Sequence, residues 1–180
     1  MSETINRFMG HLEGLRKRED RGALAMLRRG LGKPPGTVPD MYPHVVPYMQ
    51  QDTPSWEEKT CYIIGSLFAN HPLEGGHDNM GYSLARLRVV KPSGEDSVER
   101  RFVSLLNCHS DDLSQHLRQI VGLLKSNEIP IDWRQLFRDI LYWDHPDRYV
   151  QNSWARAFWG GRAYEEETLN STENSDEGGK

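Results

Sequence analysis

The residues of this sequence best suited to binding chemistry are arginines, and they are concentrated near its start. Between Arg7 and Lys33 there are eight Lys and Arg residues against three acids, whereas the whole chain of 180 residues has a formal net charge of −4. A guanidinium group binds phosphate bidentately and stacks on bases. A cationic cluster in an acidic chain therefore indicates a polyanionic partner.

The acidic excess lies at the other end of the chain. From Glu165 onward there are six acids and one Lys, and the remainder holds 21 basic and 20 acidic residues. Of the 22 basic residues in the chain, 16 are Arg. Residues 165–180 contain too few apolar side chains to form a core, so we expect a disordered acidic tail there.

Cysteine usage and hydropathy restrict the class of protein. Cys61 and Cys108 lie within apolar helical patterns and offer no disulfide framework, which fits a reducing compartment. The first residues do not resemble a signal sequence. The longest near-apolar run, residues 61–69, is shorter than a membrane span requires. We therefore expect a cytoplasmic protein that does not enter a membrane.

Nearly every apolar pattern has the period of a helix, so the sequence predicts an all-α fold. Ser55 with Glu58, and Asp96 with Glu99, have the spacing of capping boxes. The second half shows four helices joined by short turns, which is typical of a bundle. The predicted helices cover residues 5–15, 21–30, 55–70, 83–89, 96–107, 110–124, 133–143 and 147–159, with a brief helical stretch within 41–49 and an exposed loop at 71–81.

Helical geometry places several of the cations on the outside of these helices. Arg100 lies nearly opposite the apolar stripe of its helix, and Arg101 lies on the flank of that stripe. Arg118 and Lys125 are seven residues apart, so they share a face with a separation of about 10 Å along the axis. That spacing suits successive phosphates of a strand. For any single Arg the alternative is an ordinary solvated helix face.

The sequence supports an enzymatic function less well than it supports the binding of a polyanion. His77-Asp78 is a dipeptide that helical metal-dependent phosphohydrolases use, with His44, His71 and Asp112 as conceivable further ligands. The pair lies in a glycine loop, whereas metal ligands need rigid elements, so we expect surface histidines and no metal site. Cys108-His109 forms no catalytic dyad by itself. The sequence predicts no catalytic residue and no cofactor, and it predicts that the five Trp residues pack in cores, with Trp133, Trp143, Trp154 and Trp159 in the C-terminal one.

Several segments together resemble the CasB family, the small subunit of the type I-E CRISPR surveillance complex Cascade. The likeness extends from about Phe8 to Trp159. It is carried by residues 21–29 (RGALAMLRR), 67–69 (LFA), 79–84 (NMGYSL), 99–102 (ERRF), 117–119 (LRQ) and 131–133 (IDW).

The resemblance implies a non-catalytic, all-helical protein of two small bundles with about eight or nine helices. We expect an N-terminal helical domain at 1–95, a C-terminal bundle at 96–164 and the tail at 165–180. The implied partners are crRNA, single-stranded and R-loop DNA, the backbone and large subunits of Cascade, and a second copy of the chain. The implied role is to stabilise the guide–target duplex and the displaced strand.

The candidate nucleic-acid-binding residues combine the cationic cluster with the positions that match the family. They are Arg21, Arg28, Arg29, Lys59, Arg86, Arg100, Arg101, Arg118, Lys125, Arg148 and Arg156. Two other function classes stay open at this point. One is a protein-interaction scaffold whose arginines pair with acidic partners, and the other is a metal-dependent phosphohydrolase.

Overall fold

The computed structural model describes residues 3–160, and within them every regular element is helical, which confirms the all-α prediction. The elements are α1 (Glu3–Lys17), α2 (Arg21–Arg28), α3 (Tyr42–Val45) between the 3-10 turns Pro39–Met41 and Val46–Tyr48, α4 (Ser55–Asn70), α5 (Met80–Val90), the 3-10 turn Pro92–Gly94, α6 (Glu95–Asn107), α7 (Ser110–Ser126), α8 (Trp133–Leu141) and a last helix at 149–160. The predicted tail at 165–180 lies outside the described residues.

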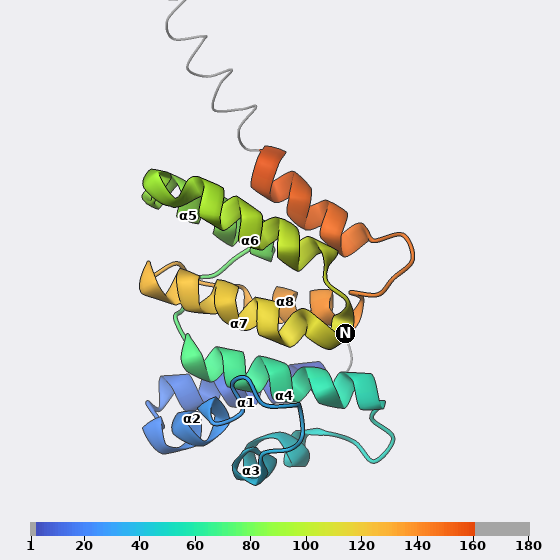
Figure 1. Ribbon diagram of the computed structural model, residues 1–180. Coiled ribbons are helices and arrows are strands. Elements are labelled where there is room, and N and C mark those ends of the chain that lie inside the picture. Colours follow the sequence, from blue (N-terminus) through green and yellow to red (C-terminus); the bar gives the residue numbers. More distant parts are fainter. Residues whose placement is uncertain (1–2, 161–180) are drawn as a thin grey trace, which may run out of the picture.

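The helices are stacked in three layers (Figure 1). The lower layer holds α1, α2, α3 and α4, the middle layer holds α7 and α8, and the upper layer holds α5, α6 and the helix at 149–160. The middle layer packs on both neighbours, because α7 and α8 contact α4 below and α7 contacts α5 and α6 above. None of the described helices combines the length and apolar character that crossing a membrane requires.

Aromatic side chains join the layers into one continuous core. Phe8 of α1 meets Phe137 of α8 with ring centroids 6.3 Å apart. Phe68 of α4 meets Trp133 of α8 at 5.6 Å. In the upper part, Trp154 packs on Trp143 at 5.1 Å. Buried aromatic pairs of this kind contribute about 0.5–1.5 kcal/mol beyond the area that they bury.

The tryptophan prediction is confirmed for the C-terminal core and wrong for one residue. Trp133, Trp143 and Trp154 are buried, and Trp159 is partly buried against the core. Trp56, in contrast, is 52% exposed at the start of α4. Helical spacing alone did not distinguish it, because Trp56 lines an open groove while Glu57 of the same turn is buried.

Helix starts follow local capping at some positions and tertiary context at others. Asp20, Asn79 and Asp132 each cap a helix, and their side-chain oxygens accept backbone N–H bonds. The two predicted capping boxes are wrong. The N-cap of α4 is Pro54, so Ser55 already lies inside that helix. The 3-10 turn Pro92–Gly94 runs directly into α6 and makes Gly94 its N-cap, so Asp96 also lies inside its helix.

The predicted exposed loop at 71–81 is shorter and more buried than expected. Helix α5 begins at Met80, three residues before the predicted start, and both Met80 and Gly81 are buried. A Cβ atom at Gly81 would come within 2.0 Å of the backbone oxygen of Trp154. The close approach of two helix backbones at Gly81 therefore requires glycine there, and buries the start of α5.

The domain division at residue 95 stays a prediction. Helix α5 precedes that boundary and packs against α6 and α7, which follow it. Helices from both predicted domains contribute to the one core.

Candidate nucleic-acid interface

All eleven predicted binding residues have exposed side chains. They occur on α2 and just after it (Arg21, Arg28, Arg29), on α4 (Lys59), α5 (Arg86), α6 (Arg100, Arg101) and α7 (Arg118, Lys125), and before and within the helix at 149–160 (Arg148, Arg156). Exposure makes these cations available to a ligand. Exposure alone does not show which of them lie close together.

Helix α2 presents its cations because its short apolar stripe is buried. Asp20 caps the helix by accepting a bond from the N–H of Ala23, and Leu24 and Leu27 pack into the core. Arg28 is left on the exposed side. Arg29 Nη1 lies 2.6 Å from Asp40 Oδ1, so a neighbouring carboxylate already offsets its charge.

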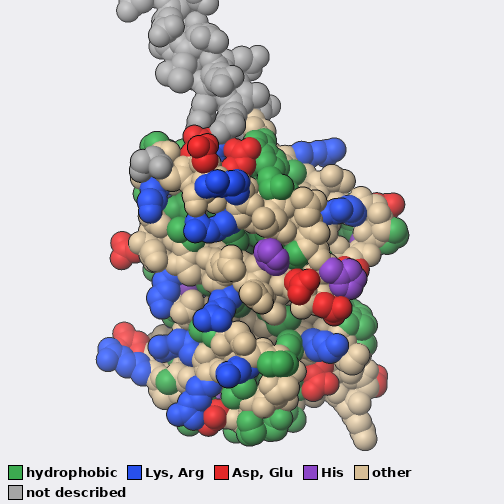
Figure 2. All heavy atoms as spheres, viewed as in Figure 1, with side chains coloured by type: hydrophobic (Ala, Val, Ile, Leu, Met, Phe, Trp, Pro, Cys, Tyr) green, Lys and Arg blue, Asp and Glu red, His purple; other side chains and the backbone are tan. Residues whose placement is uncertain are grey.

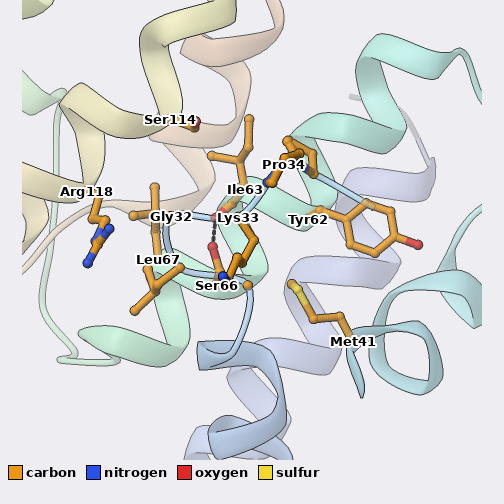
Figure 3. Close-up of a pocket in the computed structure, with 13 residues that line it drawn as sticks. Gly32, Lys33, Pro34, Met41, Tyr62, Ile63, Ser66, Leu67, Ser114 and Arg118 are labelled. Atoms are coloured by element: carbon orange, nitrogen blue, oxygen red, sulfur yellow. Dashed lines mark hydrogen bonds between the residues drawn. The ribbon is translucent and has the colours of Figure 1, made fainter. Parts of the chain in front are cut away.

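The loop after α2, which follows the cationic residues at the end of that helix, contacts α7 (Figure 3). Gly32 has a φ of +71°, a left-handed conformation that glycine adopts without strain. The guanidinium of Arg118 lies against it, so closely that a Cβ atom at residue 32 would be 2.2 Å from Nη1. Lys33 lines the same small pocket as Arg118, together with Ser66 and Leu67 of α4. Three segments far apart in sequence therefore meet here.

Arg118 and Lys125 share the solvent side of α7, as their spacing predicts. Leu117, Val121 and Leu124 of the same helix are buried. Lys125 Nζ donates a hydrogen bond to Asn70 Oδ1 at the end of α4, with a length of 3.0 Å. We refer to Arg28, Lys33, Arg118 and Lys125 as the cationic track.

Lys and Arg side chains are most numerous on the left half of one face of the molecule, from the layer of α6 across α7 to the lower layer (Figure 2). A group of Asp or Glu and His side chains lies to the right, near the start of α7, and further acidic side chains lie at the upper edge and the left margin. The first turn of α7 carries Asp111 and Asp112. The positive half of this face suits a phosphate backbone better than the other half.

Three other predicted cations have contacts outside the cationic track. Arg101 Nη1 donates to Ser97 Oγ on α6 at 2.8 Å, which holds it along its own helix. Lys59 lines a separate groove near the start of α4. Arg148 has a φ of +50° and donates to the backbone oxygen of Leu106, so it ties the link before the last helix to the end of α6.

A family model for CRISPR-associated protein Cse2 matches residues 23–159, three quarters of the chain. The chain belongs to the Cse2 family. A curated relative, the CRISPR-associated protein Cse2 of Thermus thermophilus, is 38% identical over 146 residues, which cover 81% of this chain and 83% of the relative. This confirms the resemblance to CasB that the sequence indicated, since solved structures with that name match as well.

Solved structures agree with the Cse2 assignment. CasB from M. ruber superimposes with a TM-score of 0.75 at 31% identity and covers 90% of this chain and 97% of its own. A chain of a structure described as a CRISPR RNA-guided surveillance complex, pre-nicking, reaches a TM-score of 0.77 at 27% identity, with 93% of this chain and 97% of that chain covered.

Several cations of this Cse2 chain have structural partners, which the sequence did not reveal. Arg134 of α8 forms two hydrogen bonds with Glu13 of α1, at 2.7 and 2.9 Å. Arg16 pairs with Glu74 at 2.9 Å. Arg88 is 11% exposed and pairs with Glu95. These partners are up to 121 residues away, so no local pattern could separate structural from available cations. Lys33, which the site prediction omitted, was detectable only as part of the cluster that begins at Arg7.

The candidate metal ligands of this Cse2 chain lie in separate environments. His71 is 5% exposed, and its Nε2 bonds to the backbone oxygen of Ile129 at 2.7 Å, so the prediction of a surface residue is wrong for it. His44 stacks on His11, and His77 packs on Tyr82.

Cys108 and His109 lie in the link between α6 and α7, where burial raises the pKa of the Cys108 thiol to about 11. A thiol with so high a pKa is a poor nucleophile.

Proposed function

We propose that this Cse2-family chain is a non-catalytic subunit of an RNA-guided CRISPR surveillance complex and that its cationic track holds a nucleic-acid backbone. The observation that carries the proposal is the meeting of Arg118 with Gly32, which joins the cationic end of α2 to the exposed face of α7. Structures described as surveillance complexes contain chains of this fold. The proposed partners are crRNA, target and displaced DNA, the backbone and large subunits, and a second copy of this chain.

The mechanism is electrostatic and does not read sequence. R-loop formation exchanges one duplex for another of similar stability, so contacts of modest strength with the backbone can decide its direction. Arg118 and Lys125 stand about 10 Å apart along α7, and Lys33 and Arg28 extend the positive surface onto the lower layer. Such a surface would hold the displaced strand away from its complement and support the guide–target duplex. This action needs no catalytic group, and we place it in the cytoplasm.

Salt dependence tests the proposal. We expect the purified chain and its complex to bind single-stranded DNA and an R-loop with an affinity that falls steeply between about 50 and 200 mM salt. The combined Arg28→Ala, Lys33→Ala, Arg118→Ala and Lys125→Ala variant should lower the slope of log K against log salt by roughly one for each phosphate that the variant no longer binds. Arg7→Ala, which removes an exposed Arg of α1 that is not part of the cationic track, serves as a control for the loss of one positive charge.

A second variant set tests four of the remaining predicted residues, those on α5, α6 and the last helix. It combines Arg86→Ala, Arg100→Ala, Arg101→Ala and Arg156→Ala on α5, α6 and the last helix. If this set lowers the slope and the first set does not, the interface lies on the upper layer and the cationic track is wrong. A chain that joins the complex but shows no salt slope in any form would instead be a protein-interaction scaffold. Divalent-metal-dependent turnover of a nucleic acid would contradict the non-catalytic role.

A further inference from the structure

A groove of about 600 Å³ separates the first half of α4 from the first half of α7 and the end of α8. The loop segment Pro34–Pro35 also lines this groove. It lies beside the cationic track and shares Ile63 and Ser114 with the small pocket under Arg118. The proposed binding of nucleic acid does not use it.

The groove has an apolar floor and an exposed aromatic wall. Ile63, Leu113 and Ile140 form part of its lining, and each belongs to the core or packs against it. Trp56 lines the groove with 52% of its surface open to solvent. Exposed Trp side chains next to apolar depressions are frequent anchors of protein interfaces, because burying them removes a large apolar area from water.

More acidic than basic side chains line the groove. Lys59 lies one helical turn after Trp56, whereas Asp111 and Asp144 line the groove from α7 and from the turn after α8. The side chain of Asp111 is 87% exposed, and its Oδ2 lies 3.4 Å from Nδ1 of His109. Two carboxylates against one ammonium group repel a phosphate and attract a cation.

We propose that this groove docks a segment of a partner protein that presents an apolar side chain next to a Lys or Arg. The apolar side chain would occupy the floor, and the cation would reach Asp111 and Asp144, with Trp56 offering a ring face to the guanidinium or ammonium group. The inference rests on the proposed function in one respect only, which is that the partner belongs to the same complex. The charge complementarity favours a basic protein segment over a nucleotide.

Selection of peptides from a library tests the chemistry without the complex. A phage-displayed library of random heptapeptides is selected on the full chain and counter-selected on the Trp56→Ala variant. We expect the recovered peptides to share a large apolar residue adjacent to Lys or Arg, and the combined Asp111→Asn and Asp144→Asn variant to bind them at least about tenfold more weakly. Recovery of acidic peptides, or no enrichment over the Trp56→Ala counter-target, would overturn the inference.

Reconstitution of the complex from its co-expressed subunits tests the role of the groove in assembly. Native mass spectrometry gives the fraction of complexes that contain this chain. We expect Trp56→Ala and the double Asp variant to reduce that fraction severalfold, while Trp56→Phe retains most of it and Asp112→Asn, one residue outside the groove, leaves it unchanged. Single-stranded DNA binding by the isolated variants should not weaken, because none of them removes a cation of the cationic track.

The outcomes separate this inference from the proposed function. If the wild-type chain never joins the complex, the proposed function fails, and the peptide selection alone decides the chemistry of the groove. If both groove variants join the complex as the wild type does, the docking inference is wrong and the proposed function stands. If they join normally but lose DNA binding, the groove holds nucleic acid, which also contradicts the inference.

Discussion

Gly32 lies directly against the guanidinium of Arg118, and this contact joins the loop after α2 to the exposed face of α7. The residues are 86 positions apart in the sequence. Gly32 has a φ of +71°, a backbone conformation that glycine adopts without strain, and the end of the Arg118 side chain fills the space that a Cβ atom would take. The cationic track therefore depends on a residue without charge.

Replacing this glycine should disturb both stability and the track. Gly32→Ala forces a Cβ into the left-handed region and against Arg118, so we expect a loss of about 1–2 kcal/mol in the free energy of unfolding, measured by urea denaturation. DNA binding should weaken as Arg118 is displaced. The Gly32→Ala, Arg118→Ala double variant separates the two causes. A cost that disappears in it would show that crowding, and not backbone strain, is responsible.

Removing the acidic partner of Arg29 should strengthen nucleic-acid binding. Asp40 lies 2.6 Å from the guanidinium and offsets its charge, and both side chains are largely exposed. In Asp40→Asn we expect single-stranded DNA to bind roughly two- to fivefold more tightly at low salt, with a change in stability below about 1 kcal/mol. Fluorescence anisotropy titrations measure the affinity. An unchanged affinity would place Arg29 outside the interface.

Two glycines in helices should respond in opposite directions to alanine. A Cβ at Gly81 would come within 2.0 Å of the backbone oxygen of Trp154, so Gly81→Ala should destabilise the fold by about 1–3 kcal/mol. At Gly122 of α7 a Cβ meets no atom within 4 Å, so Gly122→Ala should stabilise it by about 0.5–1 kcal/mol. Thermal unfolding followed by circular dichroism compares them. A similar melting temperature for both variants would contradict the close packing of α5 on the last helix.

Arg86 and Arg88 should differ although both belong to α5. Arg88 pairs with Glu95 at 3.0 Å, donates to the backbone oxygen of Phe158 at 2.8 Å and lies 4.7 Å from the centre of that ring. Its loss in Arg88→Ala should cost about 2 kcal/mol, because partly buried polar groups lose their partners. Arg86 is exposed, so Arg86→Ala should change stability by less than about 0.5 kcal/mol. Urea denaturation of both variants measures the difference.

Stability should fall in mild acid because of His11. Burial, followed by the charges of His44 and Arg18, lowers the pKa of His11 in the folded chain. The unfolded chain therefore binds more protons below the ordinary histidine value of about 6.5, so folding free energy is lost as the pH falls through that window. The buried Nε2 of His11 has no hydrogen-bond partner within the described part of the chain. A charged ring would therefore be poorly accommodated.

The variant His11→Gln tests this pH dependence. Urea denaturation at about pH 7.5 and about pH 5.5 should show a smaller loss of stability in the variant than in the wild type. His77→Gln, which changes an exposed histidine, should behave as the wild type does. An equal loss in all three proteins would assign the effect to other groups.

Helix positions were largely predictable because helical periodicity is a local property. The stripes of Ile5 to Leu15 and of Leu113 to Leu124 lie within the observed α1 and α7, and Asp20 caps α2 as its sequence position indicates. The exposure of Arg118 and Lys125 also follows from spacing alone. Where the prediction failed, at Ser55, Asp96 and the start of α5, a neighbouring turn or a packed helix decided the boundary.

The amino-acid sequence by itself determined the all-helical class, most helix positions, the family and the exposure of the eleven predicted cations. Only the tertiary structure decided which cations are available and which are structural. Arg134 is bound by Glu13 and Arg29 by Asp40, while Lys33 and Arg118 line the same small pocket. The physical reason is that charge pairing acts through space over a few ångströms, and the chain brings together partners that lie far apart along it.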